Sequence, residues 1–193
     1  MKCASCSDKK CTEGKDCTNL KEKIKEKYSS EDLIILDVAS QLTEKFYMQK
    51  TRMEEILFYA KEMGYQKLGL FFCNGLKEEA RIIDVILSKE FKVYSVMCKV
   101  CGIERSELLP RLKTQDGKRG ISCNPIGQAM ILNRRKTELN IAVGLCMGHD
   151  ILFSKYSKAP VTTLVVKDRV LAHNPLGAIY SWYYRKKRFY LDK

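Results

Sequence analysis

Apolar residues recur along the chain with two different spacings, and the two spacings alternate. Four short apolar runs are typical of buried strands, and they cover residues 67–72, 92–97, 140–146 and 161–167. The stretches between them carry apolar residues at helical spacing, over residues 76–90, 125–135 and 151–157. Strands that alternate with single helices favour a parallel sheet covered on both faces. The pattern predicts an α/β fold, a Rossmann-like parallel sheet of about four strands flanked by helices.

Helical spacing also precedes the first strand and follows the last one. Ser29 is a candidate N-cap of a helix that runs to Phe46, with Asp32 suited to its first turn. Further helices are predicted over residues 52–63 and 175–189, and the charged residues 21–27 suit a short helix or a connector. The polar stretch 104–120 predicts a lid or an ordered surface loop.

Each predicted strand is followed by cysteine, histidine or aspartate side chains. In chain order, these residues are Cys73, Cys98, Cys101, Cys146, His149, Asp150, Asp168 and His173. Right-handed crossovers place the C-terminal ends of parallel strands on one edge of the sheet, and ligands bind outside that edge. The sequence therefore predicts one site there, with His149, Asp150 and His173 as candidate catalytic residues.

The cysteines of this edge suit a metal site. Cys98 and Cys101 have the C-x2-C spacing that lets two sulfurs bind one ion, and Cys123 and Cys146 are the natural third and fourth ligands. Cys73 is either a substitute ligand, a residue that supports the ligands, or a small hydrophobic residue of the core. All-sulfur ligation suits zinc or an iron–sulfur cluster, and the spacing does not choose between them.

The first twenty residues predict a second site of the same kind. Cys3, Cys6, Cys11 and Cys17 have the pattern C-x2-C-x4-C-x5-C, which can wrap one tetrahedral ion or an iron–sulfur cluster. The segment has almost no apolar residues, so metal binding would supply the folding free energy that a core cannot. We expect a Cys-rich metal-binding segment over 1–20 and an α/β domain over 21–193.

Two predicted helix starts repeat one pattern. Residues 123–125 read Cys-Asn-Pro and residues 173–175 read His-Asn-Pro, with Asn suited to the N-cap and Pro to the first helical position. The partial positive charge of a helix N-terminus favours a thiolate at Cys123 and a neutral imidazole at His173. A neutral imidazole can bind a metal, so His173 and His149 are alternative ligands.

Composition and charge widen the set of functions. Nine cysteines are many for a chain without a signal-peptide core, and in the cytoplasm, where we expect this protein, disulfides do not persist. The C-x2-C pair also suits a thiol-based redox sensor. No apolar run approaches the roughly 20 residues of a membrane span, so we expect no membrane partner.

The formal net charge of +12 favours anionic partners, including nucleic acid. The run from Tyr183 to Tyr190 mixes basic and aromatic residues, which suits single-stranded nucleic acid. We favour the other interpretation of this run, an amphipathic terminal helix whose rings pack on the sheet. Ser122 and Asn124 could bind a small anion at a helix N-terminus. Nucleotide binding has no specific motif in its support.

Five stretches carry a resemblance to a known family. They are Met-Lys-Cys-Ala-Ser-Cys at residues 1–6, Cys-Lys-Val-Cys at 98–101, Cys-Asn-Pro-Ile-Gly-Gln-Ala at 123–129, Gly-Leu-Cys-Met-Gly-His-Asp at 144–150, and Lys-Asp-Arg-Val-Leu-Ala-His-Asn-Pro at 167–175. The chain resembles an uncharacterised bacterial family of cysteine-rich proteins, a domain of unknown function whose members are described as metal-binding. The resemblance implies metal binding and brings no reaction with it.

We therefore expect a metal-binding protein with a four-cysteine N-terminal site and a second zinc or iron–sulfur site at the sheet edge. The alternatives are a basic module that binds an anion or RNA and carries structural zinc, and a thiol-based redox sensor.

Overall fold

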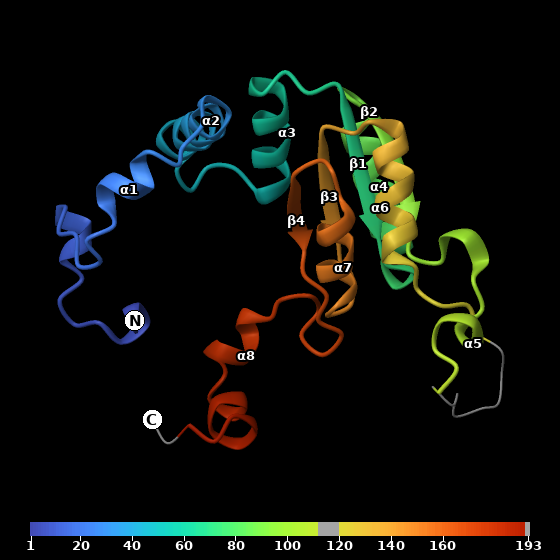
Figure 1. Ribbon diagram of the computed structural model, residues 1–193. Helices are drawn as coiled ribbons and strands as arrows, with labels where there is room; N and C mark the ends of the chain where they lie inside the picture. The colour runs from blue at the N-terminus through green and yellow to red at the C-terminus, as the bar shows by residue number, and fades with distance from the viewer. Residues whose placement is uncertain (112–119, 192–193) are drawn as a thin grey trace. The chain divides into compact units, whose positions relative to one another are not determined.

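The computed structural model describes residues 1–111 and 120–191 (Figure 1). The chain divides into two compact units, Met1–Lys50 and Thr51–Lys193, which are described separately. The Cys-rich segment expected over residues 1–20 lies in the first unit, together with two helices. In the described part of the chain, no helix has the length and apolar character needed to cross a membrane.

The first unit consists of short turns and helices with little core. Its elements are the 3-10 turns Cys3–Ser5 and Lys10–Glu13 and the helices α1 (Lys21–Lys25) and α2 (Ser30–Phe46). Ser29 caps α2 as predicted, because its hydroxyl accepts the Asp32 N–H while the Asp32 carboxylate accepts the Ser29 N–H. Val38 is the one buried residue among residues 1–50. The turns that carry the N-terminal cysteines therefore have no core beneath them.

The second unit is built on a four-stranded sheet, and the predicted α/β fold is confirmed. The strands are β1 (Lys67–Phe72), β2 (Lys92–Met97), β3 (Leu139–Val143) and β4 (Val161–Val165). All pairs are parallel, and the strand order is β2-β1-β3-β4. The limits of the first two strands agree with the sequence prediction, whereas β3 and β4 end earlier and leave residues 144–146 and 166–167 in the connecting turns.

The helices of the second unit connect and cover these strands. They are α3 (Arg52–Glu62), α4 (Lys77–Leu87), α5 (Arg105–Leu108), α6 (Pro125–Arg135), α7 (His149–Tyr156) and α8 (Leu176–Tyr180). Leu70 of β1 belongs to a core with Ile56 of α3 and Leu87 of α4. The next residue, Phe71, belongs to a second core with residues of α6 and with Phe153 of α7. Because successive strand residues point to opposite faces, the two cores lie on opposite sides of the sheet.

The chain on either side of residues 121–175 departs from two predicted elements. The single helix predicted over 175–189 is wrong: α8 ends at Tyr180, Ser181 is extended (φ −77°, ψ 124°), and a separate π-helical turn covers Tyr184–Arg188. The interruption lies at Ser181, because residues 182–188 are helical again. Of the predicted loop 104–120, the structure shows α5 and a bridge between Glu104 and Ile121; residues 112–119 lie outside the described residues.

Candidate functional site

The strand order defines where a ligand would bind. From β1 the chain moves through α4 to β2 at one edge of the sheet, and from β2 it returns through α6 past β1 to β3. The connections that leave β1 and β3 therefore diverge, which creates a topological switch point at the C-terminal edge between these two strands. Gly144 makes the sharp exit from β3, with φ of 63° and the Leu76 side chain where a Cβ would lie.

Three cysteine side chains from different elements meet at this edge. The sulfur atoms of Cys98, which follows β2, and Cys123, which precedes α6, lie 3.8 Å apart. Cys73, which follows β1, is close enough to Cys98 for each thiol to shift the pKa of the other. The start of α6 holds Cys123 in place, because the Asn124 N–H donates to the Cys98 carbonyl (2.8 Å) and the Asn124 side chain accepts the Gly127 N–H. The predicted Asn-Pro start of α6 is thus confirmed.

Cys73 is buried beside a cation. Lys167 follows β4, and its ammonium nitrogen lies 2.7 Å from the Cys73 sulfur. Burial raises the pKa of Cys73, but the hydrogen bonds from Lys167 and from the Gly75 N–H, with the charge of Lys167, outweigh it and lower the pKa. Cys73 is therefore more thiolate in character than an ordinary cysteine.

Cys98 has the opposite character. Its side chain is buried, and burial raises its pKa to about 11, although the Asn74 N–H donates to its sulfur (3.3 Å) and opposes the rise. The neighbouring Cys123 and Cys73 add to the increase, because two negative charges this close are unfavourable. In the absence of a metal, Cys98 is therefore a protonated thiol beside the more acidic Cys73.

A fourth sulfur, Cys146 in the turn after β3, pairs with a second cation. The Arg169 guanidinium donates to Cys146 at 3.1 Å, and this bond, with the charges of Cys146, Cys73 and Cys123, raises the pKa of Arg169. The loop that carries Lys167 and Arg169 is shaped by Asp168, whose carboxylate accepts the N–H groups of Val170 and Leu171. The loop after β4 thus supplies one cation to Cys73 and one to Cys146.

The two histidines and Asp150 have mainly local contacts. The Asp168 N–H donates to Nδ1 of His173. A neutral His173 ring with this hydrogen bond carries its proton on Nε2, so in this arrangement Nε2 has no lone pair for a metal. His149 begins α7, and its N–H donates to the Cys146 carbonyl (2.9 Å). The Asp150 carboxylate accepts the N–H groups of Gly148 and Ile151. Their catalytic roles stay predictions.

The predicted helix start at residues 173–175 differs from the one at Cys123. Helix α8 begins at Leu176, Pro175 occupies the N-cap position, and no side chain caps the helix. His173 is in the left-handed region with φ of 64°, as is Ala172 before it. The prediction that Asn174 caps a helix with Pro175 as its first residue is therefore wrong. The turn around Asp168 determines the conformation of this segment instead.

The cysteine set that the structure brings together differs from the set that spacing suggested. Cys101 is exposed, lies in the turn Val100–Gly102 with φ of 71°, and forms no side-chain hydrogen bond within the described residues. Cys73, which sequence reasoning treated as a substitute, contacts Cys98. Cys73 could have been selected from the sequence by its position directly after a predicted strand, the signal that Cys98 also carries.

Metal-ligand geometry is not preformed. Cys3, Cys6, Cys11 and Cys17 are all exposed. Over residues 1–111 and 120–191, no group of three or more histidine, cysteine, aspartate or glutamate side chains is arranged closely enough to hold an ion. Both four-cysteine metal sites therefore stay predictions.

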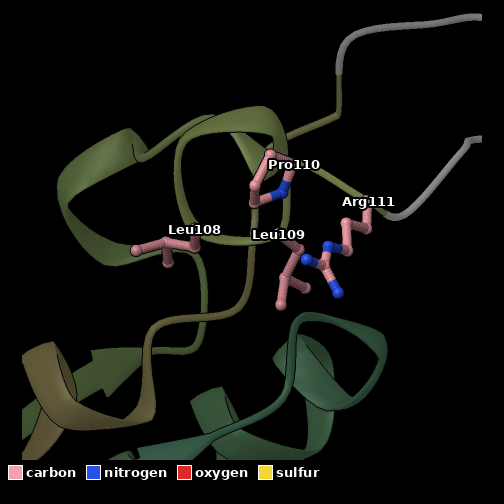
Figure 2. Close-up of a pocket in the computed structure, with 4 residues that line it drawn as sticks. All are labelled: Leu108, Leu109, Pro110 and Arg111. Carbon is pink, nitrogen blue, oxygen red and sulfur yellow. The ribbon is translucent and has the colours of Figure 1, made fainter.

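Two surface pockets lie away from the cysteines of the sheet edge. One pocket of about 450 Å³ is lined by Leu108, Leu109, Pro110 and Arg111, and Figure 2 shows these side chains around it. None of these four residues carries a thiol or an imidazole. Another, of about 470 Å³, lies within the first unit and is lined by residues of 24–39. Neither pocket includes the cysteines of the sheet edge.

Fold and site define a class: a parallel α/β protein with thiols and cations gathered at the switch point of its sheet. The chain belongs to the family described as Protein of unknown function (DUF1847), whose model matches residues 11–164. The chain is 54% identical over 189 residues to "Uncharacterized protein MJ0455" of the archaeon Methanocaldococcus jannaschii. The aligned region covers 97% of this chain and 97% of that protein. No solved structure matches the chain.

The comparisons confirm the expected membership in a family of unknown function. They do not confirm its bacterial origin, since the relative is archaeal, and they do not confirm metal binding.

Proposed function

We propose that this protein binds one metal ion at the sheet edge through Cys98 and Cys123, with Cys73 and Cys146 as the remaining ligands. The four N-terminal cysteines bind a second ion. The observation that carries this proposal is the 3.8 Å separation of the Cys98 and Cys123 sulfurs. Two thiolates on one tetrahedral zinc, each about 2.3 Å from the metal, lie about 3.8 Å apart. A disulfide would bring them to about 2.0 Å.

The same separation bears on which metal fits. In a four-iron cluster each cysteine binds a different iron, so its sulfurs lie farther apart than two sulfurs on one ion. The pair therefore favours a metal that takes both sulfurs directly, and zinc with four thiolates is the simplest case.

The cations of the β4 loop support a thiolate site. Four thiolates around a divalent ion carry an excess of negative charge, which Lys167 and Arg169 would offset. Lys167 contacts Cys73 and Arg169 contacts Cys146, and no three of the described ligand side chains lie close enough together to hold an ion, so the cysteine side chains must move closer to one another as the ion binds. Metal binding must also displace the proton of Cys98, so affinity rises with pH up to the Cys98 pKa of about 11.

Cobalt titration under anaerobic conditions tests the ligand set. The background is the full chain with Cys3, Cys6, Cys11 and Cys17 replaced by serine, which leaves the sheet edge as the thiolate site. We expect sulfur-to-cobalt charge-transfer bands and the d–d bands of a tetrahedral ion, lost in Cys98→Ser and in Cys123→Ser. Cys101→Ser is the matched control and should keep them. Loss in Cys101→Ser with retention in Cys73→Ser would contradict the proposed ligand set.

A second function is favoured by the contact between Lys167 and Cys73. The Cys73 thiolate would attack an external disulfide, such as oxidised glutathione, and release one glutathione thiolate. Cys98, after loss of its proton, would attack the mixed disulfide, release the second glutathione and leave a Cys73–Cys98 disulfide. Peptide mapping of metal-free protein after this treatment would show the cross-link. Recovery of Cys73 and Cys98 as two free thiols would exclude the reaction.

A further inference from the structure

We propose that residues 180–190, here called the aromatic segment, form a surface that binds single-stranded nucleic acid. This inference is independent of the metal site. It rests on the exposure of the aromatic rings, the charge of the segment, and the placement of its cations beside its rings.

The rings of this segment face solvent. The exposed fractions are 74% for Tyr180, 59% for Trp182, 54% for Tyr183, 49% for Phe189 and 82% for Tyr190. Rings that packed on the sheet would be largely covered, so the interpretation that we favoured for the run 183–190 is wrong for Tyr183, Phe189 and Tyr190. Exposed rings are stacking platforms that every base can use.

The segment is also strongly basic. Its cations are the four consecutive residues Arg185, Lys186, Lys187 and Arg188, and no acidic residue lies between Asp168 and Asp192. Within the described residues, none of these four cations forms a salt bridge with an acidic group. Arg185 is half-buried and its Nε atom is covered, whereas Lys186, Lys187 and Arg188 are exposed, so the charge of these three is directly available to phosphate groups.

Cations and rings lie next to one another. The Lys186 ammonium is 5.5 Å from the centre of the Trp182 ring, and the Arg188 guanidinium is 5.9 Å from the centre of Tyr184. A base that stacks on such a ring brings its phosphate close to a neighbouring cation, which is how proteins bind single strands without reading their sequence. The surface therefore fits a single strand with little sequence preference.

The backbone of the segment disfavours a membrane surface as the partner. An interfacial helix needs a continuous apolar face along its length. Here the extended Ser181 separates the five-residue α8 from the turn Tyr184–Arg188, so the rings do not share one helical face.

Trp182, the single tryptophan of the chain, permits a direct test with the full-length protein. Titration with oligouridylate of about 12 nucleotides should quench its fluorescence to saturation, and a duplex of equal length should bind more weakly. The affinity should fall with salt, with a logarithmic slope of about −2 to −3 for three to four neutralised phosphates.

Two variants sharpen the test. Replacement of Arg185, Lys186, Lys187 and Arg188 by glutamine should weaken binding at least tenfold, flatten the salt dependence, and leave cobalt binding unchanged. Removal of the same charge from Lys89, Arg134, Lys155 and Lys158, which are exposed elsewhere in the second unit, is the matched control and should change affinity less than threefold. Tyr183→Leu with Tyr190→Leu should cost about tenfold while the charge stays constant.

Three outcomes would overturn the proposal. The first is no quenching by the oligonucleotide. The second is an equal loss in the charge variant and its control, which would mean nonspecific attraction to the net charge. The third is a blue shift of Trp182 emission on vesicles of phosphatidylglycerol and phosphatidylcholine without any response to oligouridylate, which would make the segment a membrane contact.

Discussion

The two groups of four cysteines are positioned by different means. The N-terminal group lies within fifteen residues, from Cys3 to Cys17, and all four side chains are exposed on turns without a core. The sheet-edge group comes from the ends of three strands and the start of α6, and its side chains are buried or half-buried. An ion would have to organise the first group, whereas the fold itself brings the second group together.

Metal removal should have the largest effect on folding, and this effect should be confined to the segment that carries the N-terminal cysteines. Structural zinc contributes about 10–16 kcal/mol to the folding of small metal-bound segments. A strong zinc chelator should therefore abolish amide protection over residues 1–20, while the amides of β1 stay protected. Hydrogen exchange followed by mass spectrometry measures both regions in one sample. An equal loss of protection in β1 would mean that the sheet also depends on the ion.

A substitution in the core beside the sheet should weaken metal binding by the sheet-edge cysteines and leave the N-terminal cysteines unaffected. The Phe153 ring is fully buried and stacks on Phe71, with ring centres 3.4 Å apart. Phe153→Ala should lower the free energy of unfolding by about 3–5 kcal/mol, as measured in urea. Because α7 follows the Cys146 turn, the variant should also weaken metal binding at the sheet edge. Ile151→Ala, on the exposed side of α7, is the control and should change neither quantity much.

The Lys167 contact should be visible in the chemistry of Cys73. Lys167 lowers the Cys73 pKa, so Lys167→Met should raise it and reduce the thiolate fraction at neutral pH. In metal-free protein, the iodoacetamide labelling of Cys73 at pH 7 should slow several-fold, and its pH midpoint should move upward. Arg169→Met, which removes a cation from Cys146 instead, should change the Cys73 midpoint less. An unchanged midpoint in Lys167→Met would remove Lys167 from the account of Cys73.

The smallest effect should come from the helix cap in the first unit. Ser29→Ala removes the hydroxyl that accepts the Asp32 N–H, so the first turn of α2 should exchange its amides several-fold faster. Ser30→Ala, one residue further on, should have little effect. Ser29 also lowers the Asp32 pKa, so the stabilisation by that carboxylate is present above its ordinary pKa and is lost as pH falls through the lowered value. Amide exchange in wild-type protein at decreasing pH would show this loss.

The sequence predicted the sheet well because each strand has a strong local signal. Residues 67–72 and 92–97 are short apolar runs bounded by polar residues, and the parallel topology follows from the helices between them. The start of α6 was also predictable, because the N-cap and the first-turn proline act within four residues of the chain.

The composition of the cysteine group was only partly predictable. The C-x2-C spacing drew attention to Cys101, but the left-handed turn at that residue leaves its side chain exposed. The contact between Cys73 and Cys98 depends on the pairing of β1 with β2, and spacing along the chain carries no signal for it. The break after Tyr180 escaped prediction for a different reason, since the apolar spacing continues across Ser181, where the backbone is extended.

The most direct test of the account is the metal content of three forms of the full chain, purified without oxygen. We predict about two zinc ions in the wild-type protein and about one after serine replaces Cys3, Cys6, Cys11 and Cys17. We also predict about one when Cys98→Ser and Cys123→Ser are combined. Iron and acid-labile sulfide are measured in the same samples. Loss of all metal from the N-terminal variant, or full retention by the Cys98 and Cys123 variant, would contradict an independent metal site at the sheet edge.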